Sequence, residues 1–181
     1  CMVRAPFHEA AEVDYDIVIE PKMSFGTGHH ETTHMMLQHI LDNDFEGKSV
    51  LDMGCGTGVL AILAKKRGAG DVEAIDIDEW CFLNTQENIE RNNCSDIKAY
   101  QGDSSLLEGK KFDVILANIN RNILLEDIPV YANSLKKGGV LFLSGFYLED
   151  LDAISSKCNA YGLEFEKNLE KNNWVSAKYV N

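Results

Sequence analysis

Apolar strands and amphipathic helices alternate along most of the chain. From Ser49 onward, nearly unbroken apolar runs such as Val114-Ile115-Leu116 are separated by segments whose apolar residues recur at helical spacing. Strands are predicted at residues 49–52, 71–76, 97–101, 112–118 and 139–144. Helices are predicted at residues 59–67, 79–92, 122–135 and 149–161. Strands that are apolar on both sides are typical of a parallel sheet covered by helices on both faces.

The two ends of the chain follow other patterns. Residues 163–169 and 174–180 read as strands, and the short joint between them excludes a parallel crossover, which predicts an antiparallel hairpin. At the other end, residues 15–20 alternate polar and apolar side chains before Pro21, as an edge strand does, and a helix is predicted at about residues 30–41. We therefore expect one domain, in which residues 1–45 pack on a core of residues 46–181.

Composition limits the function. The chain has 181 residues, enough for one domain with a continuous core, and no apolar run long enough to span a membrane. Its five scattered cysteines fit reduced thiols, and together with the lack of an export leader they favour the cytoplasm. The chain opens Cys1-Met2 without an initiator Met, so we expect it to be part of a longer protein.

The charge balance is acidic. Acidic residues outnumber basic ones by 29 to 17, which gives a net charge of −12. Lys and Arg are dispersed, so a nucleic-acid groove is not expected. An acidic surface fits a small cationic ligand or a basic protein partner, and it equally serves plain solubility.

The most informative motif is a glycine loop, residues 54–58, that joins the first core strand to a helix. Glycine lets a ligand approach the main chain, and the loop lies at the carboxyl edge of the sheet, where open α/β sheets bind ligands. The dinucleotide pattern G-x-G-x-x-G fails from Gly54, because Val59 takes the third position. Its looser form ending in Ala61 does match from Gly56, so a nicotinamide cofactor remains an alternative, as does a turn without a ligand.

Acidic residues around the loop favour a cationic ligand. Asp52 precedes the loop, where it would repel a pyrophosphate but suits the ammonium and sulfonium groups of S-adenosylmethionine. Asp76 ends the second core strand and fits a ribose diol. Asp103 follows the third strand, where a carboxylate can accept a hydrogen bond from an adenine amino group. We expect S-adenosylmethionine, with S-adenosylhomocysteine as product, to bind these carboxylates and Gly54, Gly56 and Gly58.

A second motif matches a zinc-protease signature. His30-Glu31-Thr32-Thr33-His34 fits H-E-x-x-H letter for letter. A zinc site needs a further ligand, whereas a buried strand and the glycine loop follow here. We therefore predict that His29 and His30 cap or flank a helix start and that no metal is bound.

The combined motifs resemble the bacterial methyltransferases of large-subunit ribosomal protein eleven, the PrmA family, over nearly the whole chain. The matching stretches are Pro21 to Thr33, Asp52 to Gly58, Asp76-Ile77-Asp78, Ala117-Asn118-Ile119, Lys137 to Gly145 and Trp174. The chain departs from the family pattern at Lys22, His29, Glu31 and Asn120-Arg121. The resemblance implies a Rossmann-like class I methyltransferase fold, with a mostly parallel seven-stranded sheet and a C-terminal antiparallel hairpin.

The resemblance also implies a reaction, namely methylation of lysine side chains and the N-terminal amine of a ribosomal protein. Asn118 would be the catalytic residue that aims the amine at the donor methyl group, and both Asn118 and Thr33 would contact the donor. Phe25 and Thr27 would also bind the donor, as part of a lid over the site. Family members carry a separate N-terminal domain that grips the ribosomal protein, and we expect none within this chain.

The remaining expectations concern other residues and other functions. Asp78 is predicted to cap the helix from Glu79, and Trp80 and Trp174 are expected to pack in the core or on the surface.

No residue is a convincing general base, so solvent is expected to take the proton. A small-molecule methyltransferase with the same donor site and a donor-binding module without turnover remain alternatives.

Overall fold

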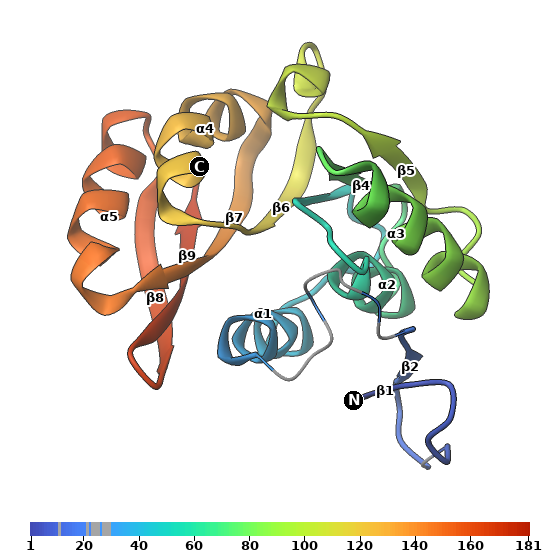
Figure 1. Cartoon of the computed structure of the whole chain (residues 1–181). Coiled ribbons are helices and arrows are strands. Elements are labelled where there is room, and N and C mark those ends of the chain that lie inside the picture. The colour runs from blue at the N-terminus through green and yellow to red at the C-terminus, as the bar shows by residue number, and fades with distance from the viewer. Residues whose placement is uncertain (11, 21, 23–25, 27–29) are drawn as a thin grey trace.

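The main element of the computed structural model is a seven-stranded sheet with the order β5-β4-β3-β6-β7-β9-β8 (Figure 1). The structure describes residues 1–10, 12–20, 22, 26 and 30–181. The strands are β3 (Val50–Met53), β4 (Val72–Asp76), β5 (Lys98–Gln101), β6 (Phe112–Asn118), β7 (Leu135–Tyr147), β8 (Glu164–Lys171) and β9 (Trp174–Val180). Strands β3 to β7 pair in parallel, and β9 is antiparallel to β7 and β8. The predicted sheet with its C-terminal hairpin is confirmed.

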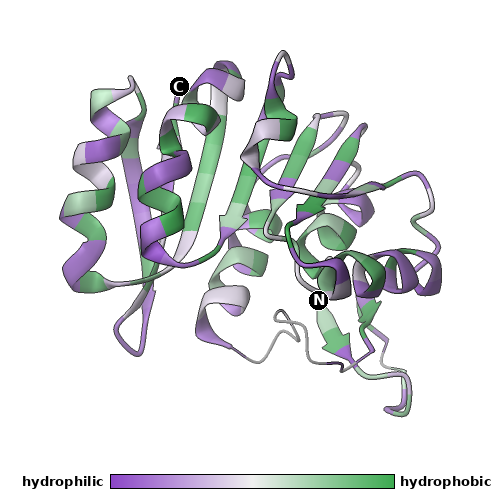
Figure 2. Ribbon diagram, turned by 45° about the horizontal axis from the view of Figure 1, so that its top comes forward, coloured by the Kyte–Doolittle hydropathy of each residue, from purple (hydrophilic) through white to green (hydrophobic). Residues whose placement is uncertain are grey.

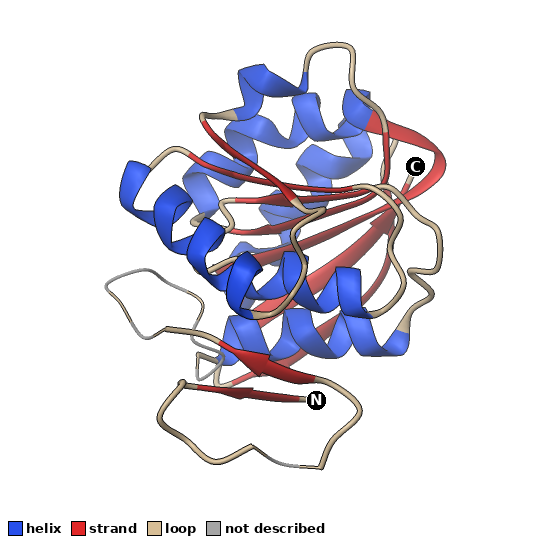
Figure 3. Ribbon diagram, turned by 90° about the vertical axis from the view of Figure 1, so that its right-hand side faces the viewer, coloured by secondary structure: helices blue, strands red, loops and turns tan. Residues whose placement is uncertain are grey.

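Helices cover both faces of this sheet (Figure 3). They are α1 (Glu31–Asp42), α2 (Val59–Lys66), α3 (Glu79–Arg91), α4 (Arg121–Ser134) and α5 (Leu151–Ala160). Side chains of α1, α2 and α3 share one core cluster with Val50 and Leu116, while α4 and α5 share the other with Leu51 and Ile115. Successive residues of β3 and β6 thus point to opposite cores, which explains why these central strands are apolar on both sides (Figure 2).

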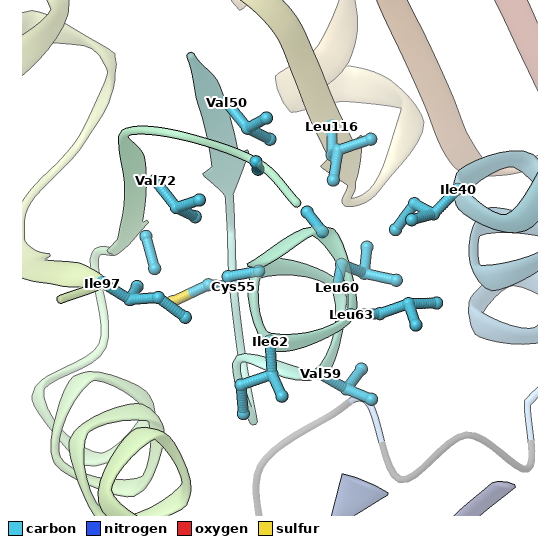
Figure 4. Packing of buried hydrophobic residues seen from close by; sticks show 14 of the residues in the cluster. Ile40, Val50, Cys55, Val59, Leu60, Ile62, Leu63, Val72, Ile97 and Leu116 are labelled. Carbon is cyan, nitrogen blue, oxygen red and sulfur yellow. The ribbon is translucent and has the colours of Figure 1, made fainter. Parts of the chain in front are cut away.

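Helix α2 lies at the centre of the first core. Leu60 and Leu63 of α2 are at most 4% exposed and pack with Ile40 of α1 and Leu116 of β6 (Figure 4). Each such side chain contributes roughly 1.5–3 kcal/mol when it is removed from water. Packing in the core therefore fixes the position of α2, and with it the C-terminal end of the glycine loop, from which α2 begins.

The strand predicted near the N-terminus is present and belongs to a small sheet of its own. Residues 15–20 supply β2 (Asp16–Val18), which does not join the main sheet but pairs in parallel with β1 (Met2–Arg4). The pair lies outside the sheet, below the helices (Figure 3). An ion pair between Arg4 and Asp16 at 2.7 Å spans the two strands. Strand β1 has only three residues, too few for an alternating pattern to be read from sequence.

Two short elements also differ from the sequence interpretation. The hairpin turn is Asn172-Asn173, with φ of 51° and 67°, and the residues on either side continue the strands. Asparagine tolerates this left-handed backbone, which matches the twist of paired strands. A 3₁₀ helix at Ser104–Leu107 was not predicted. Within the described ranges, no helix combines the length and the apolar character needed to cross a membrane.

Candidate functional site

A cavity of about 420 Å³ lies at the carboxyl edge of the sheet, where the strand order reverses between β3 and β6. Gly54, Asp76 and Asn118, at the ends of β3, β4 and β6, all line it. This edge is where open α/β sheets bind ligands, and the volume suits a nucleoside-sized molecule. Three residues predicted from separate motifs thus meet in one cavity.

The glycine loop needs glycine for two physical reasons. Gly54, Gly56 and Gly58 have φ of 69°, 57° and 78°, in the left-handed region that side chains disfavour. At Gly54, a β-carbon would also overlap the side chain of Ile119. Gly54 and Gly56 line the cavity, whereas Gly58 lies away from it at the start of α2, facing Thr85.

Main-chain N–H groups of this loop are bonded within the protein. Gly54 N and Cys55 N both donate to Ile75 O, at 2.8 and 3.0 Å. Gly56 N donates to Asp76 Oδ2 at 2.9 Å. A phosphate site works through free N–H groups at such a loop, and these three are not free. The loop therefore fits a ligand that does not place a phosphate against it.

Asp76 and Asp103 place carboxylates on the cavity wall. Asp76 is 8% exposed, and its Oδ1 also accepts a hydrogen bond from Asp78 N at 3.0 Å. Asp103 is exposed, and hydrogen bonds from the side chain and then the main chain of Ser105 lower its pKa. The bond from Ser105 N, at 2.9 Å, also caps the short 3₁₀ helix. Asp78 caps α3 by accepting from Trp80 N, as predicted.

Asp52 lies beneath the loop and not on the cavity wall. It is 1% exposed, and its Oδ2 accepts a hydrogen bond from Ala61 N, in the first turn of α2, at 3.0 Å. Burial raises the pKa of Asp52 to about 7, and the negative charge of Asp76 adds to the rise. This position differs from the expected one beside the ligand, because the Asp52 side chain points toward the start of α2.

Asn118 and Thr33 come together from distant parts of the sequence. Asn118 Nδ2 donates to Thr33 Oγ1 at 3.4 Å, across 85 positions of sequence. Asn118 Oδ1 is buried and has no hydrogen-bond partner within the described chain. Thr33 is fully buried on α1 and does not itself line the cavity, so it reaches the site through Asn118.

An aromatic cluster closes another part of the cavity. Trp174 packs between His30, at 4.9 Å, and Tyr147, at 4.1 Å between ring centroids. Both His30 and Trp174 line the cavity. The sequence interpretation treated Trp174 as packing only, because its neighbours come from α1 and β7 and are distant in sequence.

The H-E-x-x-H stretch is the start of α1. His30 is the N-cap residue, and its side chain accepts a hydrogen bond from Thr32 N, as predicted for a helix start, while His34 is exposed. In the ranges that the structure covers, no group of three or more His, Cys, Asp or Glu side chains is arranged to hold a metal ion. Phe25, Thr27 and His29 lie outside the described residues.

Other cavity residues carried little signal in the sequence. Ile119 is wedged between two glycines, since a β-carbon at Gly145 would overlap its main chain and one at Gly54 would overlap its side chain. Asp127 of α4 also lines the cavity and accepts a hydrogen bond from Ser104 Oγ at 2.8 Å. The structure places Gly145 inside β7, beyond the strand predicted at residues 139–144, and a glycine within a strand often marks such a close approach.

The strand order, the reversed β9 and the glycine loop beside two carboxylates define a class I methyltransferase fold. The chain belongs to the ribosomal protein L11 methyltransferase (PrmA) family, whose model matches residues 2–181. The family resemblance and the fold predicted from the sequence are therefore confirmed.

Known proteins agree with this assignment. Proteins named ribosomal protein L11 methyltransferase from Bacteroides fragilis and Phocaeicola vulgatus are 52% and 50% identical to this chain over 182 residues, covering 99% of it. The chain spans about 65% of the length of these relatives. A crystal structure of ribosomal protein L11 methylase from Lactobacillus delbrueckii subsp. bulgaricus has a TM-score of 0.87 at 28% identity, covering 96% of this chain and 89% of that one.

Proposed function

We propose that the chain is the catalytic part of an S-adenosylmethionine-dependent N-methyltransferase, which methylates lysine side chains and the N-terminal amine of ribosomal protein L11 in the cytoplasm. The family membership and the names of the relatives support the acceptor. One observation carries the choice of donor: the loop N–H groups of Gly54, Cys55 and Gly56 are bonded internally, while Asp76 and Asp103 line the cavity.

The residues present fit this donor. Asp76 has lone pairs beyond those that accept from Gly56 N and Asp78 N, and these suit the hydroxyls of a ribose. Gly54 brings its main chain to the cavity wall. The carboxylates favour a ligand with positive charge, and a pyrophosphate against the loop would lie close to Asp76, which bonds Gly56 N. When bound, S-adenosylmethionine supplies an electrophilic methyl group on a sulfonium.

Asn118 is the residue that would direct the acceptor amine. Its buried Oδ1 lacks a partner among the described residues, which supports a role in accepting a hydrogen bond from an amine in the cavity. Thr33 Oγ1 holds the other end of the amide and so determines which way Oδ1 faces. Alignment of this kind accounts for much of the acceleration of a transfer reaction. An amide oxygen does not take a proton, so water is the proton acceptor.

Deprotonation of the acceptor has a definite energetic cost. A free lysine has a pKa of about 10.4, so about one in 2,500 is neutral at pH 7, a deficit of roughly 4–5 kcal/mol. Removing the amine from water beside a cationic sulfonium lowers the pKa of the amine and reduces the free-energy cost of deprotonating it. The apolar wall made by Trp174 and Ile119 is suited to that removal.

Binding and transfer can be tested separately. Calorimetry with S-adenosylmethionine, S-adenosylhomocysteine and NAD is expected to detect the first two and not NAD. Labelled methyl transfer is then measured with ribosomal protein L11 and, in parallel, with a mixture of cell metabolites. Label in L11 supports the proposal, whereas label in metabolites alone identifies a small-molecule methyltransferase. Donor binding without label in either mixture identifies a binding module, and binding of NAD alone overturns the proposal.

A further inference from the structure

We propose that Asn88 is a positioning residue for the donor site, because its side-chain amide joins the glycine loop to the segment that follows β2. The inference rests on the proposed function, since it concerns affinity for S-adenosylmethionine. Asn88 lies on α3, is 0% exposed and does not line the cavity. Its effect on the donor therefore passes through the loop.

The amide group of Asn88 is shared between two distant segments. Its Nδ2 donates to Thr57 O, in the glycine loop, at 3.0 Å, and its Oδ1 accepts from Glu20 N at 3.0 Å. Asn84 Oδ1 and Arg91 Nη1 complete the contacts of this amide at 3.2 and 3.3 Å. A buried amide with both ends bonded holds its partners in one geometry. Asn88 thus connects the loop to the N-terminal segment.

The loop depends on such anchors. Gly56 and Gly58 flank Thr57 with φ of 57° and 78°, and glycine offers little resistance to rotation of the peptide groups between them. Thr57 Oγ1 also donates to Gly26 O at 2.6 Å, and Thr85 Oγ1 donates to Gly56 O at 3.0 Å. Without Asn88, the Thr57 carbonyl loses its side-chain partner, and the donor must then order the loop as it binds.

A regular spacing explains why α3 can hold the N-terminal segment. Asn88 and Asn92 are four helical residues apart, a rise of about 6 Å. Val18 and Glu20 are two extended residues apart, about 6.6 Å. Asn92 Oδ1 accepts from Val18 N at 2.9 Å, and Asn92 Nδ2 donates to Val18 O at 2.7 Å. Asn88 makes the corresponding bond to Glu20 N, two residues further along the N-terminal segment. Asn88 and Asn92 therefore bond main-chain groups of Val18 and Glu20 on the side of β2 that faces away from β1.

Asn92 supplies a matched control for Asn88. Asn92, the C-cap residue of α3, is 6% exposed and also holds the N-terminal segment. Its side-chain bonds go to Val18 and Asn88 O, and none of them reaches residues 54–58. Loss of either asparagine weakens the docking of the segment, but only loss of Asn88 releases the loop.

The test compares the wild-type chain, Asn88→Ala and Asn92→Ala. Calorimetry with S-adenosylhomocysteine is expected to give a Kd about 5- to 20-fold weaker for Asn88→Ala, in line with the loss of a buried hydrogen bond, and within about 2-fold of wild type for Asn92→Ala. Hydrogen exchange without ligand should be faster in residues 54–60 of Asn88→Ala only. With saturating donor, Asn88→Ala should keep its kcat, because the defect lies in donor binding.

The outcomes separate this inference from the proposed function. A wild-type chain that does not bind S-adenosylhomocysteine overturns the proposed function, and this inference with it. A wild-type chain that binds, with equal Kd for the two alanine variants or with no change for Asn88→Ala, overturns this inference alone. If Asn88→Ala does not fold, Asn88→Asp takes its place, because it keeps the acceptor for Glu20 N and removes the donor to Thr57 O.

Discussion

The side chain of Ile119, just beyond β6, occupies the space that a β-carbon at Gly54 would need. The two residues follow neighbouring strands, β6 and β3, and both line the cavity. Their contact brings the glycine loop against the segment that carries Asn118. The glycine loop and Asn118 are therefore set in place by the same contact.

Gly54→Ala should weaken donor binding by more than the strain of a left-handed alanine backbone alone would cause. The new methyl group must displace Ile119, so we expect the Kd for S-adenosylhomocysteine to rise at least about 10-fold, or about 1.4 kcal/mol. Gly109→Ala is the matched control, because Gly109 has a similar φ of 74° and nothing within 4 Å of its β-carbon position. Equal Kd values for the two variants in calorimetry would contradict this role of Ile119.

Asp76→Asn should weaken donor affinity about 10- to 100-fold, because a charged acceptor of ribose hydroxyls and of Gly56 N is lost. Asp78→Asn is the control, since asparagine also caps helices well and Asp78 does not line the cavity. Calorimetry with S-adenosylhomocysteine measures both. A Kd for Asp76→Asn within 2-fold of wild type would show that Asp76 does not contribute to donor binding.

Asn118→Ala should lower kcat by about 100-fold with saturating donor, since loss of alignment costs about this much, while the donor Kd changes by less than about 3-fold. Thr33→Val should give a smaller loss of the same kind, because the bond to Asn118 is removed. Thr33→Ser keeps that hydroxyl and should restore most of the rate. Single-turnover methyl transfer measures all three, and full activity in Asn118→Ala would refute the aiming role.

Asp52 should make the unfolding free energy depend on pH. Its pKa is raised from 3.8 to about 7 by burial, so the folded chain keeps a proton that the unfolded chain loses above pH 4. Stability attributable to this residue therefore falls as pH rises from about 4 to about 7, by about 4 kcal/mol, and is level above that. Urea unfolding of wild type and Asp52→Asn across this range should show the variant gaining relative stability with pH. A constant difference would contradict the raised pKa.

Trp174→Ala should raise the KM for a ribosomal protein acceptor about 10-fold and leave the donor Kd unchanged, because the aromatic wall of the cavity is lost. Trp80→Ala is the control, since Trp80 is 48% exposed and does not line the cavity. Trp174→Phe should restore part of the affinity. Steady-state kinetics with both substrates varied gives the two constants, and a defect in donor Kd alone would place Trp174 in the donor site.

The sequence by itself determined the elements and much of their arrangement. Apolar runs with both faces buried, as at Val114-Ile115-Leu116, can pack only inside a sheet covered by helices, so the parallel sheet followed from local pattern. Asp76 and Asn118 were placed on the site because each ends a strand, and the carboxyl ends of parallel strands share an edge.

Tertiary structure alone decided which side chains face the cavity and which support it. Asp52 is the last residue but one of β3 and Asp76 the last of β4, yet Asp52 turns under the loop to hold α2 and Asp76 lines the cavity. Trp174 reaches the cavity from β9, where it contacts His30, and Asn88 reaches the glycine loop from α3. Each contact spans more than 30 positions of sequence. Patterns along the chain report burial and period, whereas the direction of a side chain toward a distant partner is set only when the elements pack.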